Sequence, residues 1–348
     1  MNRWFEQSPG LLAFLLFGIL GQSTAELCAQ PPRVVEAKED RRFEGHASSV
    51  YRVVFTPDGK NALSCSFDKT VRRWDITTGT QTDVYKISLT NDIALFADAS
   101  HALFARGQSM GSQRITLWNL DKAEEVVTWR GHEMCIKQVR LLPNGKSAVT
   151  ASCDGTAILW DLETGKQLHE FVAWRQGIGD NLPPGIPRQA GNVVIAVSPD
   201  GKSLATGTAR NNMVAVWDLI TGKELRSWPS RHGEVTSIEY SPSGEFLLTA
   251  TNNGLDTGTQ LWKATNGKLV REWLIGPQWA ACFSPNGKRF LTASPEADVR
   301  LWDVEGQIPL CRFVGHEGWV NSVTFSPDGK TALSAGDDKT VRLWRMPD

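Results

Sequence analysis

The sequence has almost no charge bias. Its 348 residues carry 37 Lys and Arg against 38 Asp and Glu, a formal net charge of −1. Because no basic excess or long charged run is present, we expect no nucleic-acid partner. A hydrophobic fraction of 41% is ample for a globular core. Tyrosine is scarce: three Tyr stand against fourteen Trp, and half of those Trp recur at regular intervals.

Long apolar runs are scarce as well. The ten-residue run Leu11–Leu20 is too short for a membrane-spanning helix, which needs roughly 20 residues. Small residues follow it at Ser23, Ala25 and Ala29, as in a signal peptide. We therefore predict a signal peptide over residues 1–29, a polar linker over 30–40 and an exported protein, periplasmic or secreted. The alternative is an uncleaved N-terminal anchor, and no other membrane segment is expected.

The cysteines follow no recognisable pattern. Six are spread singly along the chain: Cys28, Cys65, Cys135, Cys153, Cys282 and Cys311. They form no CxxC pair and no spacing typical of a metal site or a disulfide framework. All but Cys28 fall in or beside predicted strands, where a free cysteine acts as a small buried hydrophobe. We expect free thiols, although an oxidising compartment would permit disulfides.

Motifs for catalysis are missing too. The sequence contains no phosphate-binding glycine loop, no cluster of metal ligands and no HExxH helix. Carboxylates occur at turns and do not gather toward one point, as a calcium-dependent site would require. We therefore expect no metal, no cofactor and no catalytic residue.

A repeated unit organises the chain instead. Its cleanest copy runs from His316 to Trp344, where two alternating apolar runs flank Ser326–Gly329, a turn typical of a short hairpin. A third run ends on the Trp. The tryptophans that end the seven units are Trp74, Trp118, Trp160, Trp217, Trp262, Trp302 and Trp344. They recur about every 40–45 residues, apart from one longer interval, which predicts seven units of four short strands.

The last unit stops four residues after Trp344 and has no fourth strand of its own. Arg41–His46 closely matches Cys311–His316, which forms a fourth strand and the start of the next unit. We predict that the N-terminal strand completes the last unit. This pairing would close a ring and remove exposed sheet edges.

Over residues 41–348 the chain resembles the WD-repeat family of seven-bladed β-propellers, in a bacterial-type exported form. The motif of Gly-His, Asp and terminal Trp is complete in the first, third and seventh units, and the other units lose parts of it. The resemblance implies an all-β, seven-bladed propeller closed by the N-terminal strand.

The resemblance also implies structural tetrads, one per complete blade. They are His46, Ser64, Asp68 and Trp74; His132, Thr150, Asp154 and Trp160; and His316, Ser334, Asp338 and Trp344. A looser version is expected in His232, Thr249, Asp256 and Trp262. Since the same set recurs with a Trp donor, we interpret it as a buttressing hydrogen-bond network and not as a hydrolase triad.

Partner contacts in the family come from positions just after the His and just before the Asp. Carried over, they include Tyr51, Phe67, Cys135, Lys137, Cys153, Glu234, Thr236, Trp279, Trp319, Asn321 and Asp337. Blades six, seven and one adjoin in a closed ring, so Tyr51, Phe67, Trp279 and Trp319 should share one arc and act as binding hot spots. The alternative is packing between blades. The insertion 173–191, with Trp174, is expected at the same end.

Taken together, these features predict a non-enzymatic, monomeric scaffold for a protein or peptide partner. The alternative is a propeller enzyme or small-ligand binder that uses the central channel. Convergence of polar and charged side chains from several blades at one channel mouth would favour that alternative. A third possibility is the sensor portion of a larger system.

Overall fold

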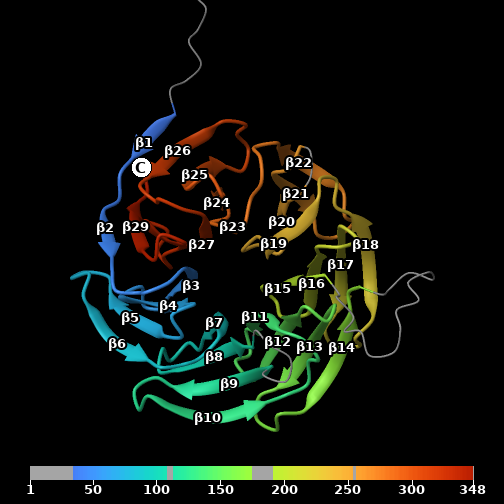
Figure 1. Ribbon diagram of the computed structural model, residues 1–348. Helices are drawn as coiled ribbons and strands as arrows, with labels where there is room; N and C mark the ends of the chain where they lie inside the picture. Colours follow the sequence, from blue (N-terminus) through green and yellow to red (C-terminus); the bar gives the residue numbers. More distant parts are fainter. Residues whose placement is uncertain (1–33, 108–112, 175–190, 254–255, 348) are drawn as a thin grey trace, which may run out of the picture. The chain divides into compact units, whose positions relative to one another are not determined.

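The computed structural model describes residues 34–107, 113–174, 191–253 and 256–347. Every regular element among these residues is a β-strand, and the strands form seven sheets arranged as blades around a ring (Figure 1). The predicted seven-bladed β-propeller is confirmed. The predicted signal peptide and most of the 173–191 insertion lie outside the described residues.

Each blade has four antiparallel strands, which run from the channel outward in chain order in blades 1 to 6. Blade 1 contains β3 (Val50–Phe55), β4 (Asn61–Ser66), β5 (Val71–Asp75) and β6 (Gln81–Tyr85). Blade 2 contains β7 (Thr90–Leu95), β8 (His101–Arg106), β9 (Arg114–Asn119) and β10 (Glu124–Trp129). Blade 3 contains β11 (Ile136–Leu141), β12 (Ser147–Ser152), β13 (Thr156–Asp161) and β14 (Gln167–Val172). Blade 4 contains β15 (Val193–Val197), β16 (Ser203–Thr208), β17 (Met213–Asp218) and β18 (Glu224–Pro229).

The remaining blades close the ring. Blade 5 contains β19 (Glu234–Tyr240), β20 (Phe246–Asn252), β21 (Thr259–Lys263) and β22 (Leu269–Trp273). Blade 6 contains β23 (Ala280–Phe283), β24 (Arg289–Ala293), β25 (Asp298–Asp303) and β26 (Pro309–Val314). Blade 7 contains β27 (Val320–Phe325), β28 (Thr331–Gly336) and β29 (Val341–Arg345), with β2 (Arg41–Phe43) outermost.

The turn between the two inner strands explains the regular spacing of each hairpin. In blade 7 the Ser326 hydroxyl donates to Asp328 at 2.6 Å and accepts the Thr331 N–H at 3.0 Å. Gly329 has a φ of +71°, a backbone conformation that side chains with a Cβ rarely adopt. The repeated Ser-Pro-Asp-Gly sequence therefore encodes a hairpin at one end of the ring.

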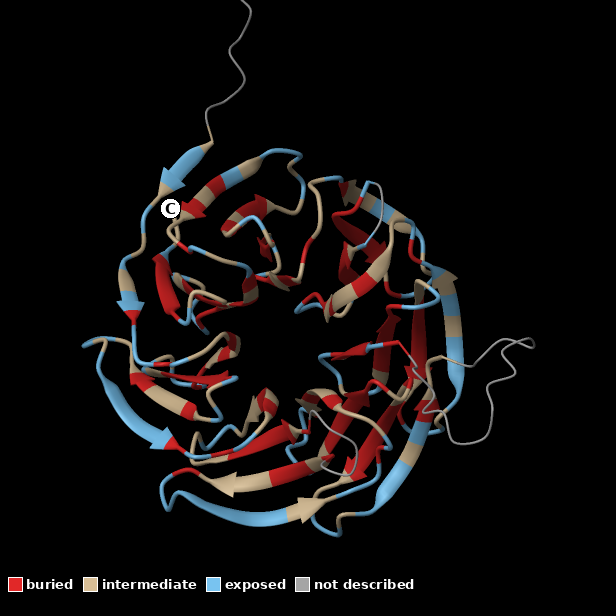
Figure 2. Ribbon diagram, viewed as in Figure 1, coloured by how far each residue is buried: buried red, intermediate tan, exposed pale blue. Residues whose placement is uncertain are grey.

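Burial falls from the middle of each blade to its rim. In β4 five of six residues are buried, whereas the outer strand β6 is exposed except at Tyr85 (Figure 2). The apolar clusters lie between neighbouring blades: one joins Phe43 and Val341 of blade 7 to Val53 and Trp74 of blade 1. Each blade therefore depends on its neighbour for a buried face.

The predicted closure of the ring by the N-terminal strand is confirmed. Strand β2 pairs antiparallel with β29, with Arg41 opposite Leu343 and Phe43 opposite Val341. The adjacent Arg342 is 1% exposed and forms ion pairs with Asp338 of its own blade and with Glu39 of the N-terminal segment. Hydrogen bonds, apolar burial and a buried ion pair therefore all hold this strand in place.

The segment predicted as a linker does more than connect. Strand β1 (Val35–Ala37) pairs in parallel with β26, the outer strand of blade 6, with Val35 opposite Cys311. The N-terminal chain thus binds blade 6 before it completes blade 7 (Figure 1). A three-residue strand is too short to give a recognisable alternating pattern, so the sequence did not indicate it.

Candidate functional site

The four-residue network of blade 1 is buried and fully connected. Trp74 Nε1 donates to Ser64 Oγ at 2.8 Å, His46 Nε2 lies 2.8 Å from the same oxygen, and His46 Nδ1 lies 2.7 Å from Asp68. Burial raises the pKa of Asp68, but hydrogen bonds from Thr70 and His46 outweigh it and lower that pKa to about 2. Because the carboxylate is ionised, His46 carries its proton on Nδ1, and each group donates to the next.

The same connections recur in blades 3 and 7. His132 lies 2.8 Å from Thr150 and 3.0 Å from Asp154, and Trp160 donates to Thr150 at 2.8 Å. In blade 7 His316, Ser334, Asp338 and Trp344 are joined in the same way, at 2.6 to 2.8 Å. Each hydroxyl is fully buried between its Trp and its His, so none faces solvent as a nucleophile would.

Blade 5 differs from the looser network that the sequence indicated. Trp262 does donate to Thr249 at 2.9 Å. His232, however, contacts Glu272 of the outer strand at 3.2 Å, and Asp256 is exposed. The prediction for His232 and Asp256 is wrong because a nearby carboxylate on β22 offers the imidazole a partner outside the blade centre.

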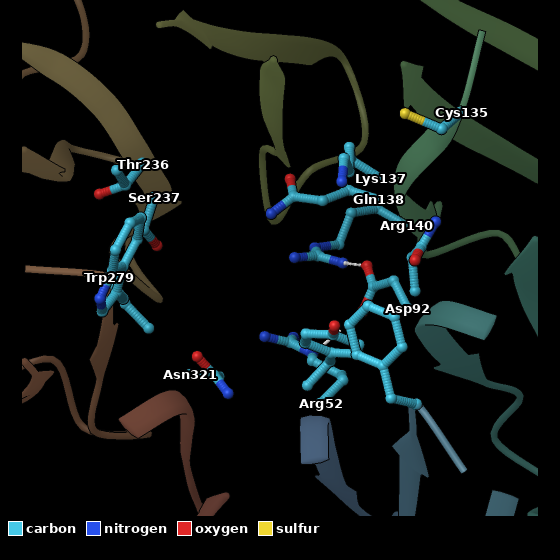
Figure 3. A pocket seen from close by; sticks show the side chains of 14 residues that line it. Arg52, Asp92, Cys135, Lys137, Gln138, Arg140, Thr236, Ser237, Trp279 and Asn321 are labelled. Atoms are coloured by element: carbon cyan, nitrogen blue, oxygen red, sulfur yellow. Dashed lines mark hydrogen bonds and ion pairs between the residues drawn. The ribbon is translucent and has the colours of Figure 1, made fainter. Parts of the chain in front are cut away.

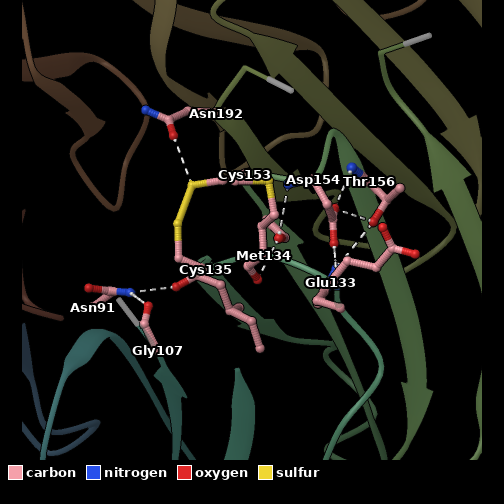
Figure 4. The surroundings of a disulfide bond; sticks show 12 residues. Asn91, Gly107, Glu133, Met134, Cys135, Cys153, Asp154, Thr156 and Asn192 are labelled. Carbon is pink, nitrogen blue, oxygen red and sulfur yellow. Dashed lines mark hydrogen bonds and ion pairs between the residues drawn. A yellow bond between two sulfur atoms is a disulfide. The ribbon is translucent and has the colours of Figure 1, made fainter. Parts of the chain in front are cut away.

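The expectation of free thiols is wrong for two cysteines. Cys135 and Cys153 form a disulfide with their Cα atoms 5.5 Å apart (Figure 4). Ile136 pairs with Ser152 in the hairpin, which places the flanking residues Cys135 and Cys153 side by side. Among the described cysteines, Cys65, Cys282 and Cys311 are free.

A signal for this pairing was present in the repeat itself. Cys135 and Cys153 occupy the positions of Ser49 and Phe67 in blade 1. In both blades the later residue donates its N–H to the carbonyl of the earlier one, at 2.9 Å in blade 3 and 3.0 Å in blade 1. Aligning the units by these positions would have placed the two sulfur atoms together.

We call Tyr51, Phe67, Trp279 and Trp319 the aromatic platform. Tyr51 and Phe67 have ring centroids 4.4 Å apart, and Trp279 stacks on Trp319 at 5.7 Å. Phe67 is 46% exposed and Trp319 51%, while the other two rings are partly buried. The structure therefore combines both sequence interpretations: one ring of each pair packs, and the other faces solvent.

The other predicted contact residues lie at the same end of the ring. Asn321 donates to Asp337 at 2.8 Å and to the Val50 carbonyl at 3.1 Å, so it bridges blades 7 and 1. Trp174 is partly buried, and its N–H donates to the Gly155 carbonyl of blade 3. It does not line the cavity described next. Residues 175–190 of the insertion lie outside the described residues.

A cavity of about 500 Å³ opens beside the platform at the mouth of the channel. We call it the channel-mouth cavity, and its lining comes from blades 1, 2, 3, 5, 6 and 7 (Figure 3). The residues are Tyr51, Arg52, Phe67, Asn91, Asp92, Cys135, Lys137, Gln138, Arg140, Thr236, Ser237, Trp279, Ala280 and Asn321. In Figure 3 the charged residues gather on one wall, across from Thr236, Ser237 and Trp279.

Two guanidinium groups share one carboxylate in this wall. Asp92 is 2% exposed, and its oxygens lie 3.0 Å from Arg52 Nε and 2.5 Å from Arg140 Nη1. The Val139 N–H also donates to it at 3.0 Å. Both arginine side chains remain about a quarter exposed, at 26% and 25%. The carboxylate is therefore held in place, while the guanidinium groups still face the channel.

A second cavity, of about 260 Å³, shares Arg52 and Arg140 with the first and adds Glu239 and Cys282. Burial raises the pKa of Glu239 to about 7, although the Phe283 N–H and the two arginines lower it. We did not predict this convergence of charges from the sequence. The pattern that could have revealed it is a charged residue directly before a buried Val or Ile on an innermost strand, as at Arg52 and Asp92.

Comparison with known families agrees with the fold. The family described as WD domain, G-beta repeat (WD40) matches residues 37–75, 123–161, 268–303 and 307–345. Each segment covers the three inner strands of one blade, in blades 1, 3, 6 and 7, together with the outer strand that precedes them in the chain. The chain therefore carries WD40 repeats on a seven-bladed β-propeller. A second match, to the family described as eukaryotic translation initiation factor eIF2A, covers residues 185–279.

Several named proteins are similar over most of the ring. A guanine nucleotide-binding protein subunit beta of Arabidopsis thaliana is 28% identical over 234 residues, covering 64% of this chain and 58% of its own. Nuclear distribution protein nudF of Aspergillus niger is 26% identical, covering 75% and 60%. The match thus spans about three fifths of these two relatives. MST50-interacting protein 11 of Pyricularia oryzae is 27% identical, covering 77% and 76%.

No three His, Cys, Asp or Glu side chains in the described part of the chain are arranged to hold a metal ion. No helix long and apolar enough to cross a membrane occurs between residue 34 and residue 347, outside the undescribed gaps.

Proposed function

We propose that the protein is a non-enzymatic, monomeric interaction scaffold that binds a protein or peptide partner at the aromatic platform. The observation that carries the proposal is Trp319, a large aromatic 51% exposed and stacked on Trp279 beside the channel-mouth cavity. Exposed Trp and Tyr next to a pocket are typical of binding hot spots. The names of two relatives, a protein subunit and an interacting protein, agree with such a role.

The test is Trp319→Ala, measured against a captured partner. A partner would be found by pull-down with mass spectrometry, and its Kd measured by biolayer interferometry. Truncation of a hot-spot residue costs about 2 kcal/mol or more, so we expect Kd to rise about thirtyfold or more with Tm nearly unchanged. Ile220→Ala, at an exposed turn on the other end of the ring, is the control. A Trp319→Ala protein that unfolds, or that binds as tightly as the control, contradicts the proposal.

The second candidate is a small-ligand binder or enzyme that uses the channel. Its support is the convergence of Arg52, Asp92 and Arg140 from three blades at one mouth. Isothermal titration with small anions would test the binding role. Heat from a small anion at low micromolar concentration would favour this candidate over the scaffold.

We also propose export. The leader-like residues 1–29 motivate it, and the Cys135–Cys153 disulfide agrees with an oxidising compartment. The relatives reported above come from a plant and from fungi, so the bacterial type rests on the leader alone. N-terminal sequencing of the mature protein should begin near Glu26 or Gln30. A cytosolic protein that retains Met1 would contradict export.

A further inference from the structure

The channel-mouth cavity has more positive than negative charge. Three cationic side chains line it, Arg52, Lys137 and Arg140, against the single carboxylate of Asp92. Both arginines already share that carboxylate. In the adjoining smaller cavity, burial raises the pKa of Glu239 to about 7, so its negative charge is incomplete at neutral pH. The lining therefore leaves positive charge uncompensated in a partly enclosed space.

Lys137 is the clearest unpaired group. Among the described residues it has no hydrogen bond or ion pair, and burial lowers its pKa. Removing an ammonium group from water without a partner is unfavourable, and an anion would offset that cost. Lys137 and Arg140 lie together on the wall shown in Figure 3.

The neutral groups nearby also offer donors. Gln138 Oε1 accepts the Ile195 N–H at 2.7 Å, which leaves the amide hydrogens of Gln138 available. The Trp279 indole N–H is buried without a hydrogen-bond partner in the described part of the chain. Thr236 and Ser237 use their hydroxyls on backbone carbonyls, the first at 2.7 Å. Asn91 and Asn321, in contrast, spend their amide hydrogens on protein acceptors. The cationic side chains and the Gln138 amide are therefore the donors that a ligand such as a carboxylate could use.

We propose that the channel-mouth cavity receives an acidic side chain of a protein partner, whose carboxylate lies against Lys137, Arg52 and Arg140. An apolar residue beside it in the partner would rest on the aromatic platform, three of whose rings line the same cavity. This inference rests on the proposed interaction face and names the chemistry of its partner. The volume of about 500 Å³ falls in the usual range for ligand pockets, about 300–1,000 Å³.

The direct test uses a fluorescein-labelled hexaglutamate peptide at low ionic strength, followed by fluorescence anisotropy. A hexaserine peptide is the neutral reference, and inorganic phosphate and citrate are free-anion probes. Lys137→Gln removes one positive charge without breaking an ion pair. Lys146→Gln removes the same charge at an exposed turn at the other end of blade 3 and is the matched control.

We expect hexaglutamate, but not hexaserine, to bind, and Lys137→Gln to weaken it about tenfold, as loss of one close charge would. Lys146→Gln should leave its Kd unchanged, and Lys137→Glu should abolish binding while Tm stays near that of the parent. Equal binding by the Lys137→Gln and Lys146→Gln proteins overturns the inference. Tighter binding of phosphate or citrate than of the peptide also overturns it, in favour of a free anion.

The two proposals can fail separately. If Trp319→Ala releases a captured partner and Lys137→Gln does not, the interaction face stands and the acidic contact is wrong. If hexaglutamate binding depends on Lys137 but no partner depends on Trp319, the acidic site stands and the platform is wrong.

Discussion

Blades 3 and 2 are neighbours that hold the indole of their terminal Trp in different ways. In blade 3 the Trp160 indole donates to Thr150, which leads through His132 to a buried aspartate. In blade 2 the corresponding Trp118 indole N–H has no hydrogen-bond partner among the described residues. Phe104 stands where blade 3 has its hydroxyl, and it packs edge-on against Trp118 at 6.2 Å.

Blade 6 holds its terminal Trp in a third way. Trp302 donates to Thr292 at 3.1 Å, but no histidine continues the chain in this blade. Asp298, 2% exposed, instead accepts from Ser294 at 2.6 Å and from Arg300 and Arg312 at 2.8 Å each. All three blades therefore need an apolar interface with their neighbours, whereas their polar networks differ. We expect the stability of each blade to depend differently on mutation and pH for that reason.

The largest expected effect concerns the closed ring. Deleting residues 31–46 removes β1, β2 and His46, exposes the edges of β26 and β29 and leaves Arg342 without Glu39. We expect Tm, measured by circular dichroism, to fall by more than about 10 °C. Deletion of residues 1–33 is the control and keeps both strands. An equal Tm for the two truncated proteins would refute closure by the N-terminal strand.

A smaller effect separates blades 3 and 2. Trp160→Phe removes the donor to Thr150, whereas Trp118→Phe removes an indole N–H that has no partner. Both changes remove the same part of the indole, so their difference reports the hydrogen bond together with the deeper burial of Trp160. We expect Trp160→Phe to cost about 1–2 kcal/mol more free energy of unfolding in urea titrations. Equal losses would mean that the network adds nothing to packing.

The period of the fold was predictable because it is local. Each unit carries its own turn, strand pattern and terminal Trp, so seven blades and the missing fourth strand could be counted directly. Contacts between units are different, since they depend on which inner-strand residues face the channel. Asp92 lies 48 positions before Arg140 in the sequence, and only the assembled ring brings them together.

The candidate site was therefore predicted in part. The aromatic positions were carried over from the family resemblance, and the structure groups Tyr51, Phe67 and Trp279 around one cavity. Two features of that site depend on strand register and were not predicted: the disulfide Cys135–Cys153 and the pair of guanidinium groups on Asp92. The partner of His232 was missed because an outer-strand carboxylate competes with the blade centre.

Acid should weaken the networks of blades 1 and 7. Burial lowers the pKa of His46 and of His316 in the folded protein, although their aspartates oppose this shift. The unfolded chain then binds protons first, so the free energy of unfolding falls as pH drops below about 6.5, by at most about 1.4 kcal/mol per histidine per pH unit. A second decrease follows below about pH 3.9, as pH approaches the folded pKa of Asp68, about 2. Urea titrations across pH 5 to 8 should show a shallower slope in a His46→Gln, His316→Gln protein.

The smallest effect should come from His232, which contacts the outer strand of blade 5 and not the blade centre. The side chains of His232 and Glu272 are 22% and 31% exposed, and such pairs contribute about 1 kcal/mol or less. We expect His232→Ala to change the free energy of unfolding by no more than that. His132, whose side chain is fully buried between Thr150 and Asp154, is the matched comparison. His132→Ala should cost several times more, because it empties a buried site, leaves the Thr150 hydroxyl hydrogen without its acceptor and removes one donor from Asp154. If the two alanine variants unfold at the same urea concentration, the buried network is no stronger than a surface ion pair, and the distinction between the blades is one of sequence only.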